Sequence, residues 1–298
     1  MPRGSTLACH VVASPPSRHP LMGPNPGCKD KTPSTREEPM RPNPWLDCIR
    51  EGNLALGAWL SNPSTINAEI MGSAGFEYVA IDAQHGAIDY STMLPMLQVL
   101  AIGDSTPIVR VPTNDSGHIG KALDAGAHAV IVPMVNDRAA CERALAYTRY
   151  APEGERSFGP TRAVLVEGDD YYDFAADRIS LIPMIETVEA MRNIDEILSV
   201  PGVEAIYVGP NDLSISLGIK PNTNDPRLDE AMVEIVAGCR RNGVVPGVHA
   251  SAALCAKRVE QGFGMVTVSA DVVALRAHVR QDLATARGTV ADSISSTY

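Results

Sequence analysis

From residue 45 onward, short apolar runs alternate regularly with amphipathic helical segments. Each run is rich in residues that favour β-strands, and a polar or Gly/Pro turn separates it from the next helical segment. The strands are expected at residues 54–60, 76–82, 106–112, 127–135, 180–186, 203–209, 244–250 and 265–271. Eight strand–helix units in about 250 residues are typical of an α/β TIM (β/α)8 barrel, whose active site forms at the carboxyl ends of the strands.

A doubly wound open sheet is the structural alternative to the barrel. That fold carries a G-x-G-x-x-G turn after its first strand, and the chain has no such turn there. We therefore expect one barrel domain over residues 40–298. Residues 1–39 are rich in Pro, Ser, Gly and Thr and show no periodicity, which predicts a disordered N-terminal tail. An upstream translation start would explain this tail, and its many prolines make an organellar presequence the poorer explanation.

Composition narrows the class of partner. The net charge is −10, whereas binding to nucleic acid needs clustered Lys and Arg to neutralise phosphates. A small-molecule partner is expected instead. The six cysteines are scattered, with no zinc-ligand spacing, which indicates reduced thiols in a cytoplasmic protein. No apolar run approaches the roughly 20 residues of a membrane helix, so no contact with a membrane is expected.

The stretch from Leu181 to Leu213 forms one strand–helix–strand unit that carries two acids. Glu186 ends the first strand and Asp212 lies just beyond the second. Parallel strands have their carboxyl ends on the same edge, so the two carboxylates converge if the strands are neighbours. Such a pair, with positions left open for water and substrate, suits Mg²⁺ or Mn²⁺. The alternative is that both acids are solvated loop residues.

Other polar residues collect at the same predicted edge. His85 lies just beyond the second strand, and its side chain titrates near neutrality, which favours a role as proton carrier. Arg110 lies in an apolar strand and must pair with a buried acid or face a ligand. Trp59 is equally compatible with packing and with substrate contact, and His249 follows no motif. Spacing alone leaves Asp124 as a surface acid.

One long irregular segment, residues 151–177, separates the fourth and fifth strands. Long loops in compact domains are usually functional. We expect this loop on the same edge as Glu186, where it would help to read a substrate.

The motifs IDAQHG, PIVRVPTND, ALDAGAHAVIVPMV, PMIET and VGPNDLS, in this order, resemble the HpcH/HpaI aldolase family. The resemblance covers about residues 45–285, and the combination of motifs is specific. It implies a TIM barrel that assembles as a hexamer, a trimer of dimers with exchange of the C-terminal helix. It also implies class II, metal-dependent cleavage of a 4-hydroxy-2-oxo acid to pyruvate and an aldehyde through a metal-bound pyruvate enolate.

The resemblance assigns roles to individual residues. Glu186 and Asp212 would bind the divalent metal ion, Mg²⁺, Mn²⁺ or Co²⁺. His85 would be the base and Asp124 the partner that raises its basicity. Arg110 would stabilise the oxyanion, and the backbone at Asn211 and Asp212 would hold the pyruvate carboxylate.

Two positions depart from the family pattern. Met184 stands two residues before the metal-binding Glu, where relatives often have Gln, so a polar contact to the oxo acid would be missing. Gln84 stands where some relatives have Glu, which makes the surroundings of the base less negative. Either change could alter substrate or metal preference. The part of the substrate that becomes the aldehyde would be recognised by Trp59, the 151–177 loop and residues of a neighbouring subunit.

Three other functions are compatible with parts of this pattern. A Schiff-base aldolase needs a lysine at a strand end, and none of the five lysines is predicted there. Citrate-lyase-like cleavage of acyl-CoA, or decarboxylation of oxaloacetate, would use the same fold and metal. A non-catalytic barrel that serves as a binding protein would be expected to lack part of the acid, base and cation set.

Overall fold

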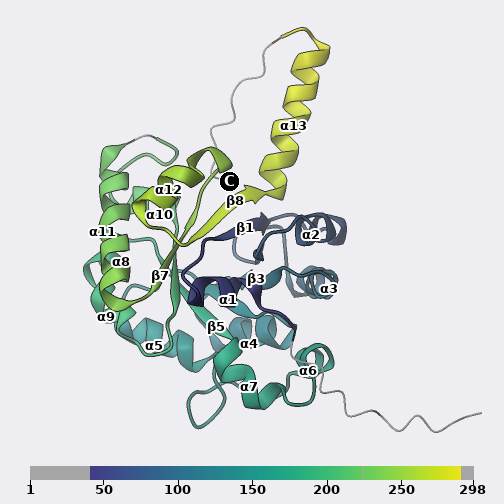
Figure 1. The fold of residues 1–298 in the computed structure, drawn as a ribbon, viewed down its shortest axis with the longest axis vertical. Helices are drawn as coiled ribbons and strands as arrows, with labels where there is room; N and C mark the ends of the chain where they lie inside the picture. The colour runs from purple at the N-terminus through teal and green to yellow at the C-terminus, as the bar shows by residue number, and fades with distance from the viewer. Residues whose placement is uncertain (1–40, 224, 290–298) are drawn as a thin grey trace, which may run out of the picture. The chain divides into compact units, whose positions relative to one another are not determined.

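The computed structural model describes residues 41–223 and 225–289, and they form a closed parallel barrel in which strands β1 to β8 follow one another in sequence order (Figure 1). The bounds of the strands are β1 Ala55–Leu60, β2 Tyr78–Asp82, β3 Thr106–Arg110, β4 Ala129–Val132, β5 Ser180–Ile185, β6 Ala205–Val208, β7 Val245–His249 and β8 Met265–Ala270. All eight predicted strands are present, and the predicted TIM barrel is confirmed. The predicted disordered tail, residues 1–39, lies outside the described residues.

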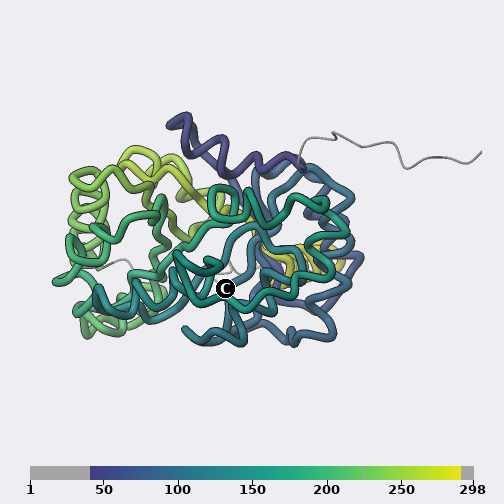
Figure 2. Tube along the Cα trace, turned by 90° about the horizontal axis from the view of Figure 1, so that it is seen from below, coloured from purple at the N-terminus to yellow at the C-terminus, as the bar shows by residue number. Residues whose placement is uncertain are grey.

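The helices surround the barrel: in Figure 2, α11 (green) lies on the side opposite to α2 and α3 (blue). Their bounds are α1 Pro44–Arg50, α2 Thr65–Gly72, α3 Tyr90–Leu100, α4 Ser116–Asp124, α5 Arg138–Ala146, α6 Thr161–Glu167, α7 Tyr171–Arg178, α8 Val188–Arg192, α9 Ile194–Leu198, α10 Pro210–Ser216, α11 Pro226–Asn242, α12 Cys255–Gln261 and α13 Asp271–Ala286, with a 3-10 turn at Ala252–Leu254. Several helices begin where a side chain caps them. Asp89, for example, accepts a hydrogen bond from the backbone of Thr92 and completes a capping box before α3.

The hydrophobic core has two layers because successive residues of a strand point to opposite faces. One layer lies between the strands and the helices. The other fills the barrel interior, where Ala80 and Ile108 face inward, and helix α1 adds Trp45 and Leu46 to it. Gly57 leaves the space that the ring of Tyr78 occupies, since a Cβ there would lie 2.0 Å from that ring. The interior is thus packed, and side chains at the last inward positions are presented at the mouth.

The 151–177 segment does not lie on the edge where it was expected. Helix α5 follows β4 and carries the chain back to the amino ends of the strands before this segment begins. The segment forms α6 and α7 there, and Arg162 donates hydrogen bonds to the backbone carbonyls of Leu97 and Ala125, at the ends of α3 and α4. The prediction that this loop shares an edge with Glu186 is therefore wrong, and within one chain it does not reach a substrate at that edge.

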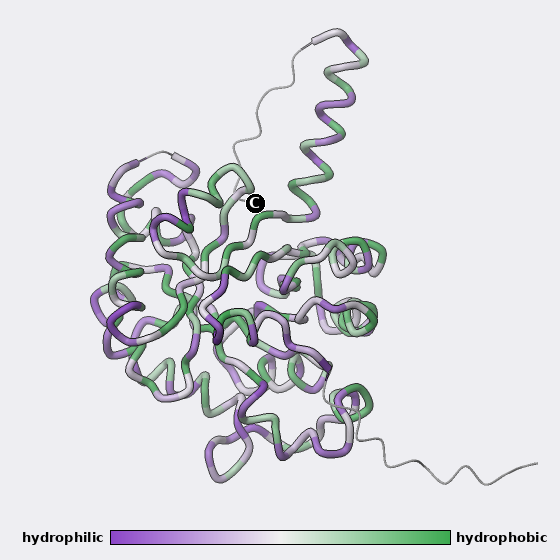
Figure 3. Tube along the Cα trace, in the orientation of Figure 1, coloured by the Kyte–Doolittle hydropathy of each residue, from purple (hydrophilic) through white to green (hydrophobic). Residues whose placement is uncertain are grey.

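Helix α13 projects from the barrel beyond the end of β8 (Figure 1). Apolar and polar residues alternate along it (Figure 3). Leu275, Val279 and Leu283 recur at helical spacing and are 60%, 54% and 47% exposed. One stripe of the helix is therefore apolar and uncovered in a single chain.

Two further expectations concern the described residues. Cys48, Cys141, Cys239 and Cys255 are all free thiols, as predicted. Within residues 41–223 and 225–289, no helix combines the length and the apolar character needed to cross a bilayer.

Candidate active site

A buried ion pair lies at the carboxyl ends of β2 and β3. The register of these parallel strands places Asp82 opposite Arg110, and both side chains point into the barrel. Arg110 donates from Nε to Oδ1 at 2.9 Å and from Nη2 to Oδ2 at 2.6 Å, and each side chain is 1% exposed. A buried guanidinium needs such a matched carboxylate. The acid that the sequence required for Arg110 is therefore Asp82.

Asp82 also positions the turn that carries His85. Its Oδ1 accepts hydrogen bonds from the backbone N–H groups of Gln84 and His85, both at 3.1 Å, and its Oδ2 accepts one from the indole of Trp59 at 3.3 Å. Burial alone would raise the pKa of Asp82. The hydrogen bonds and charge of Arg110, with smaller contributions from these donors, hold that pKa below its ordinary value. Asp82 is thus a fixed anion that orders the His85 turn.

Trp59 forms the floor beneath this ion pair. It is 1% exposed, stacks on Tyr207 with ring centroids 5.6 Å apart and meets His249 edge-on at 5.3 Å. The guanidinium carbon of Arg110 lies 4.9 Å from the centre of the Trp59 ring. Trp59, which was considered as a substrate contact, lies in the barrel interior and supports Arg110.

His249 is the last inward residue of β7. It is 5% exposed, and its Nδ1 lies 3.5 Å from the hydroxyl of Tyr207, which also bonds to Thr267 at 2.6 Å. Burial, and then the charge of Arg110, lower the pKa of His249 to about 4, although Asp82 opposes the shift. The imidazole is therefore neutral at neutral pH.

Glu186 and Asp212 lie on the other side of the mouth, at the carboxyl ends of β5 and β6. Glu186 is 2% exposed, and its Oε1 accepts a hydrogen bond from the backbone N–H of Met134 at 2.7 Å. Asp212 lies in the first turn of α10. Burial raises the pKa of Glu186, and the negative charge of Asp212 raises it further. The N–H group of Met134 and the charge of Arg110 act in the opposite direction but do not cancel the rise. The two predicted metal ligands are thus close enough for their charges to interact.

Two unusual backbone positions adjoin Glu186. Met134 has φ +55°, a left-handed conformation that is uncommon for a residue with a side chain. Gly209 lies across from Glu186, and a Cβ there would be 2.6 Å from Oε2 of Glu186 and 3.0 Å from Cε of Met184. Met184 itself is 1% exposed in the barrel interior, directly below Glu186.

The chemistry of these donors fits a hard divalent cation. Two carboxylates from adjacent strands repel each other, and a cation between them would remove that repulsion. The described part of the chain contains no group of three or more Asp, Glu, His or Cys residues arranged around one point. A cation held by these two carboxylates would have further positions open for water and substrate.

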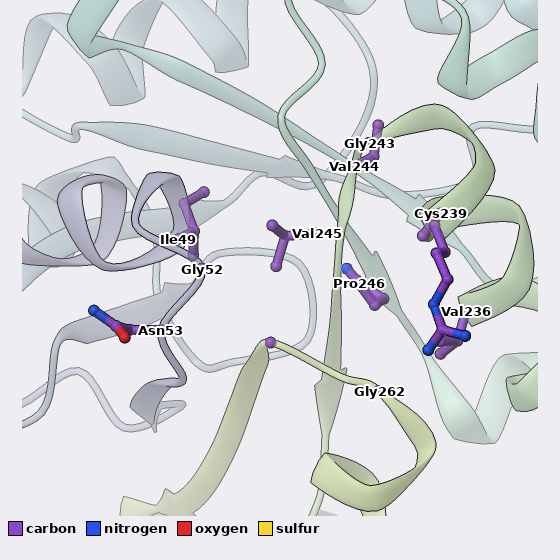
Figure 4. Close-up of a pocket in the computed structure, with 12 residues that line it drawn as sticks. Ile49, Gly52, Asn53, Val236, Cys239, Gly243, Val244, Val245, Pro246 and Gly262 are labelled. Atoms are coloured by element: carbon purple, nitrogen blue, oxygen red, sulfur yellow. The ribbon is translucent and has the colours of Figure 1, made fainter.

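A hollow of about 430 Å³ adjoins Asp82 and His85, and its other lining residues are Ser61, Ala270, Val272, Val273 and Arg276. A second hollow, of about 330 Å³, lies near the amino ends of β7 and β8 (Figure 4). Its lining includes Cys239, Arg240 and Pro246 but no acid and no histidine. Of these two hollows, the one beside His85 is the one whose lining contains an acid and a histidine, groups able to move a proton.

Asp124 does not contact His85 within this chain. It ends helix α4, which places it near the amino end of β4 and away from the mouth. Its Oδ1 accepts a hydrogen bond from Arg156 at 2.7 Å, and Arg156 is 5% exposed and also bonds to Tyr171. Within this chain Asp124 compensates a buried guanidinium, and its partnership with His85 stays a prediction.

The structure brings together His85, Arg110, Glu186 and the first turn of α10, which contains Asn211 and Asp212. The sequence predicted that Arg110 pairs with a buried acid or faces a ligand but did not identify Asp82 as that acid. Strict alternation along IDAQHG and PIVRVP could have revealed it, since both residues fall on the inward face.

Comparison with known proteins identifies the family of this chain. Residues 55–277 match the model of the HpcH/HpaI aldolase/citrate lyase family. A hydroxypyruvate/pyruvate aldolase of Rhizorhabdus wittichii is 38% identical over 80% of this chain and 97% of its own length. A 4-hydroxy-2-oxo-heptane-1,7-dioate aldolase of Salmonella paratyphi A is 34% identical over 78% of this chain and 90% of its own length.

Solved structures give the same result. The crystal structure of an HpcH/HpaI aldolase/citrate lyase family protein from Burkholderia cenocepacia superposes with a TM-score of 0.78 and 30% identity, and covers 83% of this chain and 100% of that protein. The chain therefore belongs to the HpcH/HpaI aldolase/citrate lyase family and is an aldolase, a carbon–carbon lyase.

Proposed function

We propose that this chain is a class II pyruvate aldolase that cleaves a 4-hydroxy-2-oxo acid to pyruvate and an aldehyde. The observation that carries the proposal is the arrangement at the barrel mouth. Glu186 and Asp212 repel each other on one side, while His85 and the Asp82–Arg110 pair lie toward the other. This set provides a place for a cation, a proton acceptor and a fixed positive charge.

A divalent cation, Mg²⁺, Mn²⁺ or Co²⁺, would be held by the carboxylates of Glu186 and Asp212. When bound, it supplies Lewis acidity to the 2-oxo group of the substrate. Backbone N–H groups at Asn211 and Asp212, in the first turn of α10, would receive the carboxylate of the pyruvate half. Arg110 is held by its two hydrogen bonds to Asp82, and its charge would stabilise negative charge that develops on the substrate oxygen.

His85 acts as the base. In the cleavage direction an imidazole nitrogen of His85 accepts the proton of the 4-hydroxyl group, directly or through one water. The C4–O bond becomes the carbonyl of the aldehyde as the C3–C4 bond breaks, and the electrons of that bond form the enolate of pyruvate. Protonation at C3 then gives pyruvate. Asp82 orders the turn of His85 through a hydrogen bond to its backbone. Asp124 would be the partner that raises the basicity of His85.

The assembly follows from the uncovered stripe of α13. We propose a homo-oligomer, a hexamer built as a trimer of dimers, in which Leu275, Val279 and Leu283 pack on a neighbouring subunit. Free thiols at the four described cysteines support a cytoplasmic location. Replacing Leu275 and Val279 by Asp should lower the mass measured by sedimentation, whereas His278→Asp on the same exposed helix should not. An unchanged mass in the double variant would exclude this interface.

The metal mechanism is tested by removing the metal. Pyruvate release from a panel of 4-hydroxy-2-oxo acids should stop in EDTA and return with Mg²⁺, Mn²⁺ or Co²⁺. His85→Gln should lower kcat by about a hundredfold or more, because general-base catalysis contributes at least that much. Full activity in metal-free buffer, or a pyruvate adduct trapped by borohydride, would point instead to a lysine Schiff base. Lys257 forms an ion pair with Asp229 at 2.6 Å, which holds its amino group in another contact.

A further inference from the structure

The hollow of about 430 Å³ beside His85 lies on the side of the barrel away from the metal-binding acids. Strands β8, β1 and β2 are consecutive in the closed barrel, while Glu186 and Asp212 follow β5 and β6 across the mouth. In the proposed reaction His85 takes the proton from the hydroxyl on C4. The atoms beyond C4, which become the aldehyde, therefore extend into this hollow.

The wall of the hollow opposite His85 is apolar except for one charged group. Ala270, Val272 and Val273 come from the end of β8 and the first turn of α13, and Arg276 follows one turn later. Among the described residues Arg276 has no hydrogen bond and no ion pair. The only acid in the lining is Asp82, and it is paired with Arg110. The hollow thus offers a substrate an apolar wall and a single accessible cation.

Asp271 fixes the position of this wall. The Asp271 carboxylate is 5% exposed and accepts hydrogen bonds from the backbone of Ser61 at 3.0 Å, Asn62 at 3.2 Å and Val272 at 2.7 Å. It also accepts one from the side chain of Asn67 at 3.1 Å. The start of α13 is therefore tied to the loop after β1, which fixes where the helix that carries Arg276 leaves the end of β8.

We infer that Arg276 is a specificity-determining residue, and that it selects 4-hydroxy-2-oxo acids whose aldehyde half ends in a carboxylate. The inference rests on the proposed aldolase function and adds the residue that recognises the tail of the substrate. A guanidinium binds a carboxylate through two parallel hydrogen bonds, whereas a neutral tail would leave this cation without a partner. The apolar wall accommodates the methylene groups between C4 and the terminal carboxylate.

Steady-state kinetics with two substrates of equal length test the inference. The first is 4-hydroxy-2-oxo-heptane-1,7-dioate, and the second is 4-hydroxy-2-oxoheptanoate, which ends in a methyl group. Arg276→Gln should raise KM for the dicarboxylic acid at least about tenfold, because the charged hydrogen bonds to the tail carboxylate are lost, and change KM for the neutral-tailed acid by less than about twofold. Arg276→Lys should recover part of the loss.

Arg280→Gln is the matched control, since it removes the same charge one turn further along α13, outside the lining of the hollow. It should change neither KM. Equal effects of Arg276→Gln on both substrates, no effect on either, or the same effect from Arg280→Gln would overturn the inference. Exchange of the methyl protons of pyruvate with D₂O in the wild-type protein tests the proposed function alone, because it requires no aldehyde half. If the wild-type protein exchanges these protons but Arg276→Gln affects the two substrates equally, only the specificity role of Arg276 is refuted.

Discussion

Asp82 and Arg110 occupy the same register position on adjacent parallel strands, and their side chains form a two-bond ion pair inside the barrel. This pair connects three functions of the site. It compensates a guanidinium in the core, it holds the backbone of the His85 turn, and it fixes the orientation of the Arg110 side chain at the mouth.

Asp82→Asn should therefore destabilise the protein strongly. The substitution leaves a buried guanidinium without its carboxylate, and breaking such a pair typically costs about 3–5 kcal/mol. Urea denaturation at pH 7 would measure the free energy of unfolding. Asp47→Asn is the control, because it removes an ion pair with Arg178 at 3.2 Å in which Asp47 is 52% exposed, and should cost less than about 1 kcal/mol. A loss of similar size in the two variants would contradict this account of the Asp82–Arg110 pair.

Glu186→Gln should separate stability from activity. The pKa of Glu186 is raised by burial and by Asp212, so its ionised form is unfavourable in the folded protein, and the neutral amide removes that cost. The free energy of unfolding in EDTA should rise, while Mn²⁺ affinity falls and pyruvate release drops by at least about a hundredfold. Glu189→Gln, on the exposed face of α8, should change none of these. Retention of both metal and activity in Glu186→Gln would exclude this residue as a ligand.

Gly209→Ala should displace the Glu186 carboxylate. The added Cβ would lie 2.6 Å from Oε2 of Glu186, and the backbone of Gly209, at φ −91°, accepts Ala without strain. We expect weaker Mn²⁺ binding by calorimetry and at least about tenfold lower activity. Gly120→Ala, in helix α4 with nothing within 4 Å of the new Cβ, should keep activity and gain about 0.5–1 kcal/mol of stability. Unaltered metal affinity in Gly209→Ala would argue against this close approach.

His249 should make stability depend on pH between about 6.5 and 4. Its pKa is about 4 in the folded chain against an ordinary value of 6.5, so the unfolded chain takes up the proton first as pH falls. The wild-type protein should lose about 2 kcal/mol from this residue between pH 7 and pH 5. His249→Gln has no group at this position that titrates in that range. The difference in the free energy of unfolding between the two proteins, measured by urea denaturation, should therefore change by about 2 kcal/mol between pH 7 and pH 5. A constant difference across this range would show that His249 is not held neutral by burial.

Periodicity, turn residues and strand-ending polar residues were enough to predict the barrel and its edge. The alternation of β-rich runs with helical segments fixes the order of the elements, and a closed parallel barrel then brings the carboxyl ends of all strands together. His85, Arg110, Glu186 and Asp212 could be placed at one end of the barrel for that reason. The family resemblance supplied their roles, which are not contained in the spacing.

Only the tertiary structure decided which side chains pair. Arg110 needed an acid, but the choice of Asp82 depends on the register between β2 and β3, and the pairing of Asp124 with Arg156 depends on where α6 and α7 return. The 151–177 segment was predicted at the wrong end of the barrel. Its position depends on helix α5, which precedes it and returns the chain to the amino ends of the strands. Local propensities determine the elements, whereas burial and charge compensation are properties of neighbours distant in sequence. The wall that carries Arg276 beside His85 therefore emerged only from the folded chain.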